Sequence, residues 1–107
     1  MDEATREHIY KHTISHDEFM NMALADPEDQ REYINASLEE YLEDGDFNMF
    51  YKSLERVIKV RDSVSNFAKK TELDRSNLYA IFNSKQKPQL ETIAKILKEL
   101  GYTLKVA

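Results

Sequence analysis

A cluster of polar side chains follows Asp74 directly, within the stretch LDRSNLYAIF. It consists of Arg75, Ser76, Asn77 and Tyr79. Arginine forms paired hydrogen bonds with guanine and asparagine forms them with adenine, while serine and tyrosine suit either a base edge or a phosphate. The types and spacing of these residues therefore favour contact with a nucleic acid. The plainer alternative is a set of solvated residues on a helix surface.

Two short apolar periodicities, interrupted after Lys70, surround this cluster and must position it. They predict one helix over residues 64–70, capped by Ser63, and a second over residues 75–83, capped by Asp74. Two short helices joined by a tight turn are the pattern of a helix-turn-helix, whose second helix enters the major groove of DNA. The residues expected to pack this unit together are small or apolar, namely Phe67, Ala68, Leu73, Leu78, Ile81 and Phe82.

The turn itself carries Glu72 where a glycine is usual. A residue at this position tends toward left-handed backbone angles, which glycine adopts without strain. A side chain in that conformation costs on the order of 1 kcal/mol. The turn therefore tolerates glutamate at a modest cost in stability.

The rest of the chain predicts an all-α protein with one short strand. The Asp-Pro-Glu run at residues 26–28 is a helix-start signal, and apolar spacing continues to about residue 42, before Gly45. Further helices are expected over residues 47–61 and over residues 88–100, where a proline opens the helix. Alternation over residues 102–106 predicts a β-strand, which needs a partner in the N-terminal segment or in a second copy of the chain.

These elements divide the chain into three parts. Residues 1–25 are expected to form an N-terminal arm, partly ordered or a short strand around HIYKHTI. Residues 26–45 form an acidic N-terminal helix. Residues 46–107 form a helix-turn-helix domain that ends in the C-terminal strand.

The formal net charge of −5 conceals two halves of opposite sign. Residues 1–51 contain three basic and 14 acidic residues, for a net charge of −11, whereas residues 52–107 contain 12 basic and six acidic residues, for +6. A positive half suits a polyanion, and a negative half suits a basic protein. Chance combined with internal neutralisation is the alternative.

Further residues around the predicted helix-turn-helix suit phosphate contact. The helix that starts after Ser63 has free N–H groups that attract anions, and lysines flank the loop after the second helix. The predicted phosphate contacts are Ser63, Ser65, Lys69, Asn83, Lys85 and Lys87. For each lysine, ordinary solvation is the alternative.

Other functional classes find little support in the sequence. The absence of cysteine excludes disulfides, and no apolar run approaches the ~20 residues that span a bilayer. The N-terminus lacks the features of a signal peptide, so we expect a cytoplasmic protein. We find no nucleophile–base constellation and no glycine-rich phosphate loop, and we expect neither an enzyme nor a cofactor. His8, His12 and His16 recur every four residues, but the weakly helical sequence between them favours exposed histidines over a metal site.

Two stretches of the chain resemble a known family. They are DPEDQREYINASLEEYLEDGD and FAKKTELDRSNLYAIFNSKQKPQLETIAKILKELGYTLKV. The second contains a Ser/Arg pair followed by LY, a polar turn with proline, and LKxLG before a short strand. This pattern resembles the HigA-like antitoxins of bacterial addiction modules, which have a Cro/repressor-type (XRE-like) helix-turn-helix and are encoded downstream of a RelE-like toxin. Glu72 and Ala80 depart from the family pattern, which has glycine at the first position and a larger polar or basic residue at the second.

The resemblance implies a Cro/repressor-like bundle that acts as a homodimer, because palindromic operators mirror a two-fold protein. It also implies repression of its own operon through operator DNA, and a partner toxin that is a small basic RelE-like ribonuclease. The acidic residues that we expect to face the toxin are Glu39, Glu40, Glu43 and Asp44, with a solvated acidic face as the alternative. Two other functions stay open: a phage- or host-type DNA-binding regulator without a toxin, and a helical protein-interaction module that binds no DNA.

Overall fold

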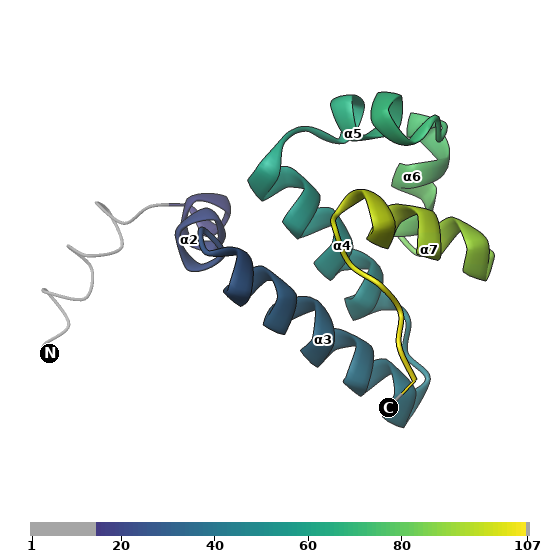
Figure 1. Cartoon of the computed structure of the whole chain (residues 1–107), viewed down its shortest axis with the longest axis horizontal. Coiled ribbons are helices and arrows are strands. Elements are labelled where there is room, and N and C mark those ends of the chain that lie inside the picture. Colours follow the sequence, from purple (N-terminus) through teal and green to yellow (C-terminus); the bar gives the residue numbers. More distant parts are fainter. Residues whose placement is uncertain (1–14, 107) are drawn as a thin grey trace, which may run out of the picture.

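The structure is a computed structural model and describes residues 15–106, which form six α-helices and no β-strand. Figure 1 shows helices α2 (His16–Ala23), α3 (Pro27–Asp44), α4 (Asn48–Arg61), α5 (Val64–Thr71), α6 (Arg75–Phe82) and α7 (Leu90–Glu99). The prediction of an all-α protein is confirmed for the described residues. None of these helices has the length and apolar character needed to cross a membrane.

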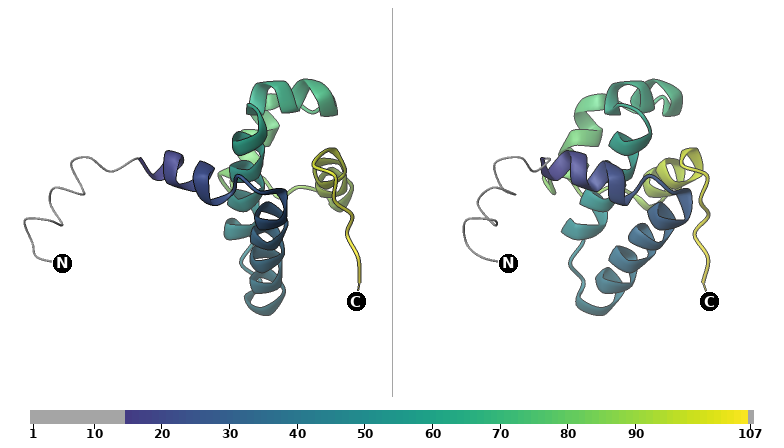
Figure 2. Two further views of the ribbon diagram at one scale, coloured as in Figure 1. Left: turned by 60° about the vertical axis from the view of Figure 1, so that its left-hand side comes forward. Right: turned by 90° about the vertical axis from the view of Figure 1, so that its left-hand side faces the viewer.

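Helices α3 and α4 lie side by side (Figures 1 and 2). Helix α3 begins after Asp26, whose side chain accepts a hydrogen bond from Glu28 N at 2.8 Å, and it ends at Gly45, which has a φ of 76°. These are the ends that its N-cap and C-terminal glycine favour. Across the α3–α4 contact, the buried Oγ atoms of Ser37 and Ser53 lie 2.7 Å apart, so the two helices approach closely there.

Helix α4 forms the centre of the fold and packs against α2, α3, α5 and α6. Its residues Leu54, Val57 and Ile58 are fully buried. The inward-facing residues expected on the second helix of the helix-turn-helix are buried in the same cluster, as predicted, and they are Leu78, Ile81 and Phe82. Burial of this apolar surface is the main term that stabilises the arrangement.

Helix α2 replaces part of the arm that we expected over residues 1–25. Ser15 Oγ accepts a hydrogen bond from Glu18 N at 3.1 Å, and this Ser-x-x-Glu spacing is a helix-start signal that the sequence analysis passed over. The remainder of the predicted arm, including the possible strand over residues 8–14, lies outside the described residues.

Helix α7 begins two residues later than predicted. Pro88 does not open it, because Gln89 has extended backbone angles and serves as the N-cap. The C-terminal end agrees with the prediction, since Gly101 has a φ of 91° and Tyr102 N donates to Leu97 O at 2.8 Å.

The β-strand predicted over residues 102–106 is not formed in this single chain. The segment leaves α7 (Figure 1), and its residues Thr103 and Leu104 line a hollow together with Ile34 and Leu38 of α3. A β-strand exists only as one member of a hydrogen-bonded pair, and residues 15–106 place no second strand beside it. The alternation of side chains is therefore present without the pairing.

Candidate functional site

Backbone hydrogen bonds build the turn between α5 and α6. Glu72 has the left-handed angles expected for its position, with φ 59° and ψ 25°. Leu73 N donates to Ala68 O at 3.2 Å and the Leu73 side chain packs on the core, which gives α5 a Schellman-type end. Asp74 Oδ1 then accepts from Asn77 N at 3.1 Å, so α6 begins at the next residue.

Helix α6 buries one face and presents the other to solvent. Arg75 and Ser76 are exposed, and Tyr79 is half-buried. The guanidinium carbon of Arg75 lies 5.6 Å from the ring centroid of Tyr79, which is the geometry of a cation–π pair. The structure therefore joins two of the four predicted base-contacting side chains into one unit.

Asn77 lies on the opposite flank of α6. It lines a hollow together with Lys87 and Thr92, which come from the loop before α7 and from α7 itself. The predicted base contacts are thus divided: Arg75 and Tyr79 stand together, while Asn77 shares its surroundings with a predicted phosphate contact.

The predicted phosphate contacts around this face have different surroundings. Ser63 is the N-cap of α5, and its Oγ accepts from Asn66 N at 3.1 Å. Ser65 is half-buried, whereas Lys69, Lys85 and Lys87 are exposed and form no ion pair with any residue in 15–106.

Asn83, at the C-terminal end of α6, is already engaged within the protein. Its Oδ1 accepts a hydrogen bond from Lys52 Nζ at 2.9 Å. The Asn83 amide nitrogen remains as the group available to a phosphate oxygen, because an amide presents both a donor and an acceptor.

Asp62 forms an ion pair with one of the two consecutive lysines on α5, Lys70, and not with the other, Lys69. It accepts hydrogen bonds from Asn66 Nδ2 at 2.9 Å and from Lys70 Nζ at 3.3 Å. The Asn66 amide, the backbone of Ser63 and Lys70 together lower the pKa of the Asp62 carboxyl, so it stays ionised. Lys70 is therefore paired with Asp62, whereas Lys69 is exposed and forms no ion pair with residues 15–106.

The acidic residues predicted to face a toxin lie on α3. Glu39, Glu40, Glu43 and Asp44 are all exposed, and none of them forms an ion pair with the described residues. Asp44 Oδ1 instead accepts a hydrogen bond from Asp46 N at 2.8 Å in the turn that follows the helix. This side of α3 is a negatively charged surface that no ion pair within residues 15–106 neutralises.

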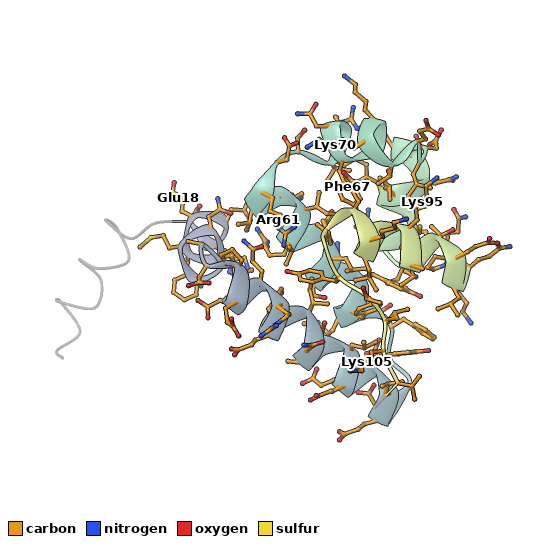
Figure 3. The ribbon with its side chains drawn as sticks, in the orientation of Figure 1. Glu18, Arg61, Phe67, Lys70, Lys95 and Lys105 are labelled. Atoms are coloured by element: carbon orange, nitrogen blue, oxygen red, sulfur yellow. The ribbon has the colours of Figure 1, made fainter. Side chains whose placement is uncertain are left out.

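Arg61 is a connecting residue that the sequence analysis missed (Figure 3). Its guanidinium donates to Gln30 Oε1 at 2.8 Å, to Leu100 O at 2.6 Å and to Tyr102 Oη at 2.9 Å. Gln30 is buried and donates in turn to Leu24 O at 2.8 Å. In sequence, Arg61 reads only as a basic residue in the last turn of a helix, so no local signal points to this role.

An ion pair between α4 and α2 ties α2 to the bundle. Arg56 Nη1 lies 2.7 Å from Asp17 Oδ1, and this hydrogen bond and charge lower the pKa of the Asp17 carboxyl. His16, the one predicted histidine within the described residues, is exposed beside this pair. Residues 15–106 contain no group of three or more His, Cys, Asp or Glu side chains that could hold a metal ion.

Fold and site together define a class of small all-helical proteins that combine an exposed polar helix after a tight turn with a separate acidic helix. The sequence model of a family described as "probable addiction module antidote protein" matches residues 18–107, and the chain belongs to this family. Membership implies an antitoxin of a toxin–antitoxin module, with a toxin as its partner. No curated protein and no solved structure matches the chain.

Proposed function

We propose that this antitoxin binds operator DNA through α5 and α6, represses its own operon and neutralises a RelE-like, mRNA-cleaving toxin. The observation that carries the DNA-binding part is the exposed Arg75–Tyr79 pair at the start of a cleanly capped helix. The residues on the buried face of α6 hold the helix in place, so the polar face is free to enter a groove.

In this proposal the N-terminal half of α6 lies in the major groove. Arg75 donates two hydrogen bonds to a guanine, and the Tyr79 ring restricts the freedom of the arginine before DNA arrives. Ser76 contacts a base edge or phosphate from the centre of the exposed face. Asn77 reads an adenine from the opposite flank, next to Lys87.

Phosphate contacts then fix the orientation of the helix on the duplex. Ser63 and Ser65 offer the N-terminus of α5 to one phosphate, and Lys69, Lys85, Lys87 and Asn83 contact others on either side. Each lysine that neutralises a phosphate steepens the salt dependence of binding by ~0.9 in log–log slope.

The acidic side of α3 would meet the toxin. A RelE-like toxin needs a basic surface to hold RNA, and Glu39, Glu40, Glu43 and Asp44 supply uncompensated negative charge to cover it. The antitoxin itself acts as a cytoplasmic homodimer, performs no catalysis and uses no cofactor. Two copies place two recognition helices on the two halves of a palindromic operator.

A band-shift titration against the DNA upstream of the chain's own operon tests the DNA-binding part. It uses two salt concentrations and compares the wild type with Arg75→Ala/Tyr79→Ala. A matched control, Arg31→Ala/Tyr33→Ala, removes the same two residue types from α3. We expect the wild type and the control to bind the operator specifically. The α6 variant should lose at least ~1–3 kcal/mol of the difference in binding free energy between operator and unrelated DNA.

Equal binding by both variants would reject the recognition helix. If the free protein shows no specific binding, the titration is repeated with the toxin added. If specific binding is still not observed, operator recognition is rejected. Neutralisation is measured separately, as growth of cells that express the toxin. Specific DNA binding without neutralisation would identify a regulator that has no toxin.

A further inference from the structure

The side chain of Asn83, at the C-terminal end of α6, is exposed and is not needed to close the helix. Backbone groups satisfy the carbonyl oxygens there. Asn83 N donates to Tyr79 O at 2.9 Å, and Lys85 N donates to Ala80 O at 2.8 Å. The Asn83 side-chain amide is therefore available for a contact outside its own helix.

Lys52, on the neighbouring helix α4, fixes the orientation of this amide. Its Nζ donates to Asn83 Oδ1 at 2.9 Å, where α4 packs against α6 (Figure 1). An ammonium group only donates hydrogen bonds, so it holds the amide by its oxygen and not by its nitrogen. Asn83 Nδ2 then lies on the other side of the planar amide, where it forms no hydrogen bond with residues 15–106.

The ammonium of Lys52 is itself held by Glu55, about one turn further along α4. Glu55 Oε1 lies 3.4 Å from Lys52 Nζ, and Glu55 Oε2 lies 3.6 Å from Lys59 Nζ. The side chain of Glu55 is only 13% exposed, whereas those of the two lysines are about half exposed. Solvated ion pairs of this kind add little stability, but they limit the positions that the Lys52 ammonium takes.

A phosphate beside the C-terminal end of α6 would meet an unfavourable field. The C-terminal end of a helix carries a partial negative charge of roughly half an elementary charge, which repels anions. An amide that turned freely would present its oxygen to the phosphate as readily as its nitrogen, and the oxygen would add to this repulsion. The hydrogen bond from Lys52 removes the unfavourable orientation of Asn83.

We propose that Lys52 is a positioning residue for DNA binding, which holds the Asn83 amide so that Nδ2 donates to a phosphate oxygen at the C-terminal end of α6. The inference rests on the proposed operator binding and deepens it, because it assigns the geometry of one phosphate contact to a residue on another helix. Lys52 acts through Asn83 and does not contact the phosphate itself. Because the amide is oriented before DNA arrives, less side-chain freedom is lost on binding.

A double-mutant cycle in the operator band-shift assay tests this role, with Lys52→Met, Asn83→Ala and the combined variant. Asn83→Ala should weaken operator binding by about tenfold, because a hydrogen bond to a charged oxygen is lost. Lys52→Met should weaken it by about threefold, because the amide loses its orientation but still reaches the phosphate. The combined variant should bind as Asn83→Ala alone does, about tenfold more weakly than the wild type and not about thirtyfold.

The salt dependence of binding separates positioning from direct contact. Lys59→Met is the matched control, because it removes the same charge from α4 and the same kind of ion pair with Glu55. We expect both lysine variants to keep the wild-type log–log slope, and Lys59→Met to keep the wild-type affinity. A slope that falls by ~0.9 in Lys52→Met, with effects that add in the combined variant, would identify a direct phosphate contact and overturn the proposal. Equal affinity of Lys52→Met and the wild type would also overturn it.

Nuclear magnetic resonance of the free, ¹⁵N-labelled protein tests the orientation of the amide without DNA. The Asn83 side-chain amide signals are identified by their absence in Asn83→Ala. They should shift in Lys52→Met, because a hydrogen bond to the amide oxygen polarises the amide, and should stay in place in Lys59→Met. Unchanged signals in Lys52→Met would reject the orienting hydrogen bond. A wild type that binds no operator, with or without toxin, instead rejects the proposed operator binding and this role of Lys52 with it.

Discussion

Helices α6 and α3 both present polar side chains to solvent, but the protein treats the two sets differently. On α6, Asp74 fixes the helix start and Tyr79 lies against the guanidinium of Arg75 at 5.6 Å. On α3, Glu39 and Glu40 extend without an ion-pair partner among residues 15–106. The exposed face of α6 holds its hydrogen-bond donors at fixed positions, whereas the exposed face of α3 carries several negative charges without fixing them.

In the proposed function, this difference separates two kinds of recognition. Reading a base edge requires hydrogen-bond donors at fixed positions, so a site of that kind is sensitive to single substitutions. Covering a basic surface depends on the sum of the charges. A single substitution should therefore change the affinity little, and the total number of charges should determine it. The four predictions below test this separation, from the largest expected effect to the smallest.

Charge reversal on α3 should abolish toxin neutralisation and spare DNA binding. Glu39→Lys/Glu40→Lys/Glu43→Lys sets like charges against a basic toxin, which costs several kcal/mol and weakens binding by about 100-fold or more. Growth rescue and a pull-down with the toxin measure this loss. The matching Glu→Gln triple variant should be intermediate, because it removes charge without reversing it. Full rescue by the Lys variant would reject the acidic side of α3 as the toxin-facing surface.

Removal of Arg61 should destabilise the junction between the two halves. Arg61→Met leaves Gln30 Oε1 and Leu100 O without their partner, at an expected cost of ~1–3 kcal/mol in the free energy of unfolding. Urea denaturation measures this cost. Arg31→Met is the matched control, because the ion pair that Arg31 forms within residues 15–106 is with Glu28 on the surface, and it should cost less than ~1 kcal/mol. Equal stability of the two variants would contradict a connecting role for Arg61.

Substitutions at two of the left-handed positions, Glu72 and Gly45, should change stability in opposite directions. Glu72 and Gly45 have similar backbone angles, with φ of 59° and 76°. Glu72→Gly relieves strain and should stabilise by up to about 1 kcal/mol, whereas Gly45→Ala should destabilise by about as much. A Cβ at Gly45 meets no atom within 4 Å, so the penalty arises from the backbone alone. Thermal unfolding midpoints that move in the same direction would contradict this account.

The smallest effect should appear on acidification. The folded-state pKa values of Asp17 and Asp62 lie below the ordinary value of 3.8, so each carboxylate stabilises the fold fully above that pH. This contribution is lost as the pH falls from about 4 through the folded-state pKa. Arg56→Met removes the main cause at Asp17 and should flatten the loss of stability between pH 5 and pH 2, by a small amount because the pair is solvated. Lys98→Met should leave the pH dependence unchanged.

Local signals in the sequence predicted most of the architecture. N-caps at Asp26, Ser63 and Asp74 each accept the expected backbone hydrogen bond, and Glu72 adopts the expected left-handed angles. These features depend on residues within one helical turn, so the sequence carries them directly. The pairing of Arg75 with Tyr79 follows from their spacing of four residues, although the sequence analysis treated them as separate contacts.

The features that sequence analysis missed depend on distant residues or on a weaker local signal. Arg61 acts through Gln30 and Leu100, which are 31 and 39 residues away, and no local pattern encodes such contacts. The strand at residues 102–106 was predicted from alternation, but its formation depends on a partner strand, which residues 15–106 do not supply. Helix α2 was missed because the β-branched residues before Ser15 outweighed its capping signal.

The contacts of Arg61 also determine the order in which parts of the chain can join as it is synthesised. Most of the fold consists of helices whose backbone hydrogen bonds form locally, as each helix leaves the ribosome. The Arg61 guanidinium meets Gln30 early, but its bonds to Leu100 O and Tyr102 Oη wait until residues 39 and 41 positions later have been translated. At roughly 5–20 residues per second, this delay lasts a few seconds. During that interval the acidic half is already complete, while the residues that Arg61 will join to it are still absent.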